Sequence, residues 1–151
     1  MKPVVRLKMA RSATVSPRHD PARLHGVVPT VVLHLVVAGV NGAAAMGIGT
    51  APAPVFAGGL AACALGVPVV GLSLSLAGWL RTGAAMVVLT YISSAALGLY
   101  NFLGMGALEA ALHSPEAPWK LAYFATAVLL PLLQIKGILE AGRIMVESRP
   151  E

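Results

Sequence analysis

The sequence predicts an all-α integral membrane protein, folded as an up-and-down bundle of four transmembrane helices. Hydrophobic residues make up 57% of the 151 residues and charged residues only 11%, which is more apolar surface than a soluble domain of this size can bury. No Lys, Arg, Asp or Glu occurs between Arg23 and Arg81, or between Arg81 and Glu109. Clusters of proline and glycine divide these uncharged stretches into segments that can each cross a bilayer.

The predicted membrane domain covers residues 27–146 and contains four spans, at about residues 27–49, 55–80, 82–105 and 119–145. At 1.5 Å per residue, about 20 helical residues cross the hydrocarbon core. The fourth span is the least regular, because Lys136 and Glu140 follow its apolar stretch. We expect this helix to continue into the cytoplasm, with the Lys136 side chain extended to the lipid headgroups.

The basic residues are concentrated before the first span, where residues 1–23 contain six of the eleven. The positive-inside rule places this end in the cytoplasm together with Arg81 and the C-terminus, so the predicted topology is N-in/C-in with residues 106–118 outside. We interpret residues 1–26 as a flexible cytoplasmic arm and residues 147–151 as a tail. The net charge of +5 then indicates topology in a multi-pass protein of a bacterial inner membrane, and we expect no nucleic-acid partner.

Small residues follow one face of the second span at steps of three and four. Lipid tails are as apolar as the helices, so helix association in a bilayer depends on close backbone contact, which small residues permit. We predict that this face packs against a partner helix. Pro68 lies on the same face and lacks a backbone N–H, so we also expect a kink there and compensation by a neighbouring helix. The predicted packing residues are Ala57, Ala61, Ala64, Gly71, Ser75 and Gly78, with Gly42 in the first span.

Polar side chains interrupt all four spans, and a polar group that faces lipid is costly. Counting helical turns from the cytoplasmic ends places His34, Gln134 and several hydroxyl groups about 10 Å into the membrane. We therefore predict an intramembrane polar layer around His34 in the cytoplasmic half of the bundle. Its candidate members are His34, Asn41, Ser73, Ser75, Thr90, Tyr91, Ser94 and Gln134.

Three roles are open for His34. Hydroxyl groups of neighbouring helices can satisfy its imidazole. It can be an axial ligand of haem or chlorophyll, which makes it the one weak candidate for a metal ligand. It can relay protons or substrate, since an ionisable group within the membrane is a candidate functional site. Haem held by two intramembrane histidines of one chain is excluded, because His19, His25 and His113 lie outside the predicted spans.

The residues give little basis for catalysis. The sequence contains no phosphate-binding loop, HExxH or CxxC motif, and its single cysteine, Cys63, lies within a span. We expect a non-enzymatic structural or accessory subunit that packs within a larger membrane complex or a homo-oligomer. Its expected partners are the lipid bilayer and other membrane subunits or further copies of itself. Two alternatives remain open: a small transporter or channel that uses the polar layer around His34, and an electron-transfer subunit that binds a tetrapyrrole through His34.

Overall fold

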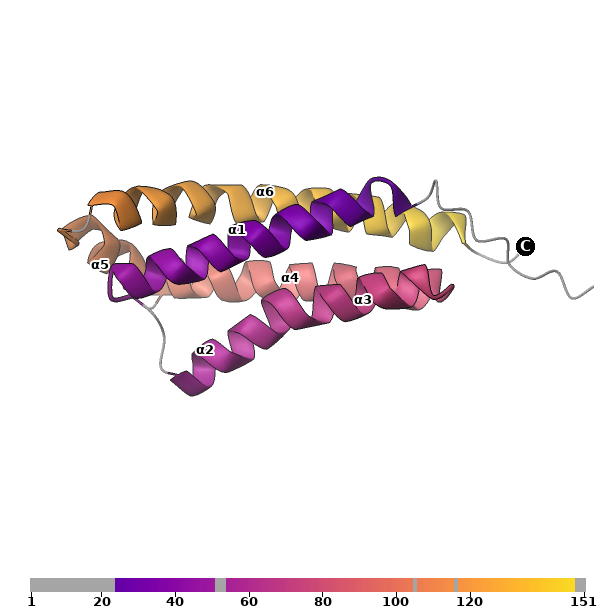
Figure 1. Ribbon diagram of the computed structural model, residues 1–151, viewed down its shortest axis with the longest axis horizontal. Helices are drawn as coiled ribbons and strands as arrows, with labels where there is room; N and C mark the ends of the chain where they lie inside the picture. The colour runs from indigo at the N-terminus through magenta and orange to yellow at the C-terminus, as the bar shows by residue number, and fades with distance from the viewer. Residues whose placement is uncertain (1–23, 51–53, 105, 116, 149–151) are drawn as a thin grey trace, which may run out of the picture.

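The computed structural model describes residues 24–50, 54–104, 106–115 and 117–148, and the regular elements within them are helical. In chain order these are α1 (Val27–Gly47), α2 (Pro54–Ala61), the π-helix η2 (Ala62–Gly66), α3 (Val67–Leu76), α4 (Leu80–Gly104), α5 (Ala107–His113) and α6 (Ala117–Glu147) (Figure 1). The predicted arm, apart from residues 24–26, and most of the predicted tail lie outside the described residues.

Four segments are long and apolar enough to cross a membrane, judged by length and composition. They are Val27–Gly47, Gly58–Leu76, Leu80–Leu103 and Pro118–Glu147. The prediction of four long apolar helices is therefore confirmed. α6 continues without a break through Lys136 and Glu140, and its 31 residues extend about 46 Å, which exceeds the thickness of a hydrocarbon core.

Two helices end slightly before the approximate span limits predicted from hydropathy, because a glycine terminates each of them. After α3, Gly78 has a φ of +99°, and the N–H of Trp79 donates to the carbonyl of Leu74. This is the Schellman arrangement, in which a glycine in the left-handed conformation terminates a helix. Gly49, with a φ of +74°, ends α1 in the same way. The second span therefore ends at Leu76 instead of residue 80, and Gly78 belongs to a turn rather than to a packing face.

α6 is central to the packing, since it lies against both α1 and α4, while α3 packs along α4 (Figure 1). Near the start of α1 and the end of α6, the helices enclose a core of mostly aliphatic side chains. Its buried members are Leu24, Val27, Val31, Ala84, Val87, Tyr91, Ala141 and Ile144. At the opposite end lies α5, a short helix that the sequence analysis did not predict, and its Ala107 and Ala111 are buried with residues of α1 and α6.

α2 diverges from the long helices, and Figure 1 shows its N-terminal end lying apart from α1, α4 and α6. The chain changes direction around η2, where the N–H of Val67 donates to the carbonyl of Ala62, five residues earlier. π-Segments and prolines both bend helices, and Pro68 follows η2 closely. The divergence separates two environments within one span: α3 contains buried residues, whereas η2 contains none.

Candidate functional site

His34 is buried between helices and has no exposed surface. Its Nε2 lies 3.2 Å from the carbonyl oxygen of Ala64 in η2, and because a carbonyl can only accept, Nε2 carries the proton and donates. Ala64 is four residues before Pro68, which has no N–H, so the α-helical hydrogen bond to this carbonyl cannot form. His34 supplies the missing donor from α1, which is the kind of compensation that Pro68 requires.

Tyr91 of α4 lies beside this imidazole and is also fully buried. The ring centroids of His34 and Tyr91 are 4.5 Å apart, and the rings are tilted by 43°. The tyrosine ring lies against α6 at Gly137, where a Cβ atom would overlap Cε2 and lie 2.7 Å from Cδ2 of Tyr91. Glycine at position 137 therefore allows α4 and α6 to enclose the aromatic pair, a role that the sequence analysis missed.

Two further polar contacts join α6 to its neighbours. Gln134 donates through Nε2 to the hydroxyl of Ser94 at 3.1 Å, which connects α6 to α4. Asn41 donates through Nδ2 to the hydroxyl of Thr126 at 2.8 Å, which connects α6 to α1. Sequence reasoning did not include Thr126. Thr126 lies eight residues before Gln134, which is slightly more than two helical turns. This spacing places Thr126 and Gln134 on one face of α6 and could have identified Thr126.

The structure does not join all the predicted residues into one layer. Ser73, Ser75 and Thr90 each donate to the carbonyl four residues earlier in their own helix, at 2.8, 3.0 and 2.7 Å. Hydroxyl groups in helices often bond in this way and then need no partner on another helix. Ser75 and Thr90 are buried, but Ser73 is exposed, so its predicted place in an interior layer is corrected.

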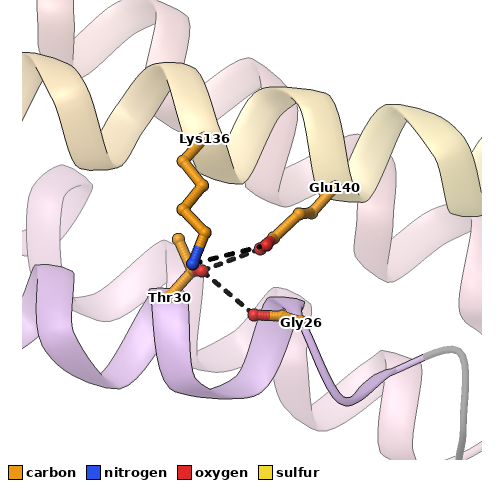
Figure 2. A network of polar contacts seen from close by, with 4 residues as sticks. All are labelled: Gly26, Thr30, Lys136 and Glu140. Atoms are coloured by element: carbon orange, nitrogen blue, oxygen red, sulfur yellow. Dashed lines mark hydrogen bonds and ion pairs between the residues drawn. The ribbon is translucent and has the colours of Figure 1, made fainter.

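A charged contact lies one turn from His34, at the first turn of α1 (Figure 2). The hydroxyl of Thr30 donates to Oε2 of Glu140 at 2.7 Å, and Nζ of Lys136 lies 3.5 Å from Oε1 of the same carboxylate. The Thr30 hydroxyl also lies 3.0 Å from the carbonyl oxygen of Gly26, which accepts the backbone N–H of Thr30 at 3.3 Å. The carboxylate is thus held near the N-terminus of α1, where negative charge is favourable.

From the sequence, Lys136 and Glu140 are expected on a helix that leaves the bilayer. The contact with Thr30 could not be predicted in this way, because it depends on how α6 and α1 are aligned. Lys136 is 59% exposed and Glu140 21%, so the ion pair itself contributes little, and the short hydrogen bond to Thr30 is the more informative contact.

The predicted small-residue face is closely packed along only part of its length. A Cβ atom at Gly71 would lie 2.9 Å from the carbonyl oxygen of Gly83, and a Cβ at Gly83 would overlap both the Gly71 carbonyl and the Ser75 hydroxyl. α3 and α4 are therefore in backbone contact, and Gly83 is a partner that the sequence analysis did not name.

Elsewhere on the predicted packing residues, no comparable glycine contact is found among the described residues. Ala61 is exposed, Ala64 is half-buried, and Gly42 is exposed with nothing within 4 Å of a Cβ built on it. Ala57 lies among residues whose side chains the structure does not describe. Ala61 and Gly42 are therefore not covered by another described helix of this chain, and their packing against a partner helix stays a prediction.

The described residues do not fit a tetrapyrrole at His34. An axial ligand needs an imidazole nitrogen that faces room for a macrocycle, whereas the His34 side chain has no exposed surface, Nε2 is engaged with Ala64, and Tyr91 lies against the ring. Within the described residues, no three His, Cys, Asp or Glu side chains are grouped so that they could hold a metal ion.

No protein-family model matches the chain, and no curated protein or solved structure is significantly similar to it.

Proposed function

We propose that the chain is a multi-pass protein of a bacterial inner membrane, with both termini in the cytoplasm and residues 106–118 outside. The four apolar helices support insertion. Trp79, in the turn between α3 and α4, is 65% exposed, and Trp119, at the opposite end, is 43% exposed. Tryptophans at both ends of apolar helices are typical of the two membrane–water interfaces.

Cysteine labelling in intact cells tests this topology. In a Cys63→Ser background, an impermeant thiol reagent should modify Ser114→Cys and leave Ser12→Cys unmodified until the cells are opened. Modification of the Ser12→Cys variant first would reverse the orientation.

We further propose that the protein acts as a non-enzymatic subunit whose role is to pack against other transmembrane helices, in a homo-oligomer or a larger membrane complex. One observation carries this proposal: in the least buried of the four apolar segments, the glycines of α2 and η2 all face open space. Gly58, Gly59 and Gly66 are exposed, and nothing lies within 4 Å of a Cβ atom built on any of them. Glycine in a helix costs about 1 kcal/mol relative to alanine, and contacts within the chain do not offset this cost here. A partner helix at close approach offsets it.

The buried fraction of each apolar segment supports the same location for the interface. In the second segment 17% of the most apolar stretch is buried inside the chain, against 28% to 33% in the other three. The polar side chains also favour packing over a transport path, since Asn41 and Gln134 bond across helix contacts and three hydroxyl groups bond to their own helices.

The single cysteine provides a direct test, because Cys63 lies exposed on η2 beside these glycines. Mild oxidation of the protein in lipid vesicles should give a disulfide-linked dimer if copies meet at this face. Native mass spectrometry in mild detergent should show an assembly larger than one chain. Gly58→Leu should weaken that assembly, whereas Gly142→Leu on α6, which also has nothing within 4 Å of its Cβ, is the matched control. A single-chain mass with no other subunit attached would contradict the proposal.

A further inference from the structure

Three buried side-chain polar atoms have no hydrogen-bond partner within the described part of the chain; one is the hydroxyl oxygen of Ser148 at the C-terminal end, and the other two lie on adjacent side chains in the interior. These two are Nδ1 of His34 and the hydroxyl oxygen of Tyr91, and both side chains are 0% exposed. The ring centroids lie 4.5 Å apart, so the two atoms belong to neighbouring side chains between α1 and α4. Buried polar groups are nearly always hydrogen-bonded, and two neighbouring exceptions therefore require an explanation.

The hydrogen-bonding capacities of these atoms are defined by their other contacts. Because Nε2 of His34 donates to Ala64, Nδ1 of the neutral imidazole is an acceptor with a free lone pair. The Tyr91 hydroxyl can donate one hydrogen bond and accept others. Polar side chains one turn away on α1 and α6 are already engaged, since Thr30 donates to Glu140 and Gln134 donates to Ser94.

We propose that His34 and Tyr91 form an internal binding site for one small neutral molecule of the size and chemistry of water. Such a molecule donates to Nδ1 and hydrogen-bonds to the Tyr91 hydroxyl, so that a single ligand satisfies both atoms. The surroundings favour a neutral ligand, because Val31, Ala84 and Val87 belong to the same buried cluster as Tyr91 and a charge would lose its hydration there. This site does not depend on the proposed subunit role.

Solid-state ¹⁵N NMR of histidine-labelled protein in lipid bilayers tests the site, with water protons as the probe. The spectrum of His34→Gln identifies the His34 signals among those of the four histidines. We expect a neutral ring protonated at Nε2, an Nδ1 signal shifted by an accepted hydrogen bond, and magnetisation transfer from water to the ring. Tyr91→Phe, which keeps the ring shape and removes the hydroxyl, should abolish the transfer.

The matched control is Tyr123→Phe, since Tyr123 is also buried but belongs to the separate cluster near α5. This variant should leave the His34 signals unchanged. An Nδ1 signal typical of a free lone pair would overturn the proposal. An accepted hydrogen bond without transfer from water, lost in Tyr91→Phe, would replace it with a direct bond between the two side chains. Water transfer that is unaffected by Tyr91→Phe would overturn the two-residue site.

Discussion

The two halves of the second apolar segment contain the same kinds of residues in opposite surroundings. In the closed half, formed by α3 where it packs on α4, Gly71 and Gly83 bring two backbones into contact. In the open half, formed by α2 and η2, Gly58 and Gly66 have no neighbour within 4 Å of a Cβ position. Small residues at helical spacing thus indicate a capacity for close packing, but the path of the helix decides whether the chain itself uses that capacity.

The largest expected effect is at the closed half. Gly83→Leu should lower the free energy of unfolding by about 3 kcal/mol, because even a Cβ atom overlaps the Gly71 backbone and the Ser75 side chain. Gly98→Leu is the control on the same helix, since nothing lies within 4 Å of its Cβ. Denaturant unfolding in detergent micelles, followed by circular dichroism, measures both. A similar loss of unfolding free energy in both variants would mean that glycines in close helix contact do not differ from glycines that face open space.

At the junction of the two halves, His34→Leu should lower the free energy of unfolding by about 2 kcal/mol, because the Ala64 carbonyl loses its hydrogen-bond donor from α1. Pro68→Ala restores an N–H at position 68 that can bond to this carbonyl. The loss caused by His34→Leu should therefore be smaller in the Pro68→Ala background than in the parent, by about 1 kcal/mol in a double-mutant cycle. Additive effects of the two substitutions would show that His34 does not compensate for the proline.

A smaller effect is expected where α6 meets the first turn of α1. Glu140→Ala should cost about 1 kcal/mol, since it removes the acceptor of the Thr30 hydroxyl while Lys136 remains solvated. The Thr30 hydroxyl retains the Gly26 carbonyl as an acceptor, which limits the loss. Glu109→Ala, at an exposed position on α5, should be neutral in the same unfolding assay. An unchanged free energy of unfolding in Glu140→Ala would mean that the contact between Glu140 and Thr30 does not hold α6 against α1.

The smallest effect is expected at Asn41. Asn41→Leu should cost about 0.6 kcal/mol, a typical value for one hydrogen bond between membrane helices. Thr126 also donates to carbonyls of its own helix, at 2.7 Å to Ala122 and 3.1 Å to Tyr123, so it is not left unpaired. A loss as large as that of His34→Leu would show that Asn41 has a further role.

The sequence predicted the number and approximate extent of the long helices because charged residues are missing over two long stretches. It predicted the need for compensation at Pro68, since the missing N–H is a property of the residue itself. It could not predict that His34 provides the compensation, nor that Gly83 and Gly137 permit close contacts. Those facts depend on how separate helices align along one another, and a helix that is apolar on all sides carries no signal of that alignment.

The errors have a different, local cause. Gly78 lies in register with the predicted packing face, but its left-handed conformation ends α3, and hydropathy does not distinguish a packing glycine from a terminating one. Hydroxyl residues such as Ser73 and Thr90 appeared to need partners, yet each is satisfied by its own helix.

The central claim is that the closed half stabilises the chain while the open half is completed by a partner. The most direct measurement compares Gly83→Leu and Gly58→Leu for both unfolding and assembly. We predict that Gly83→Leu lowers the free energy of unfolding. Gly58→Leu should leave that free energy within about 0.5 kcal/mol of the parent while abolishing the oxidative Cys63 dimer and the larger mass in native spectrometry. An assembly that survives Gly58→Leu, or an unfolding free energy reduced as much as by Gly83→Leu, would contradict the account.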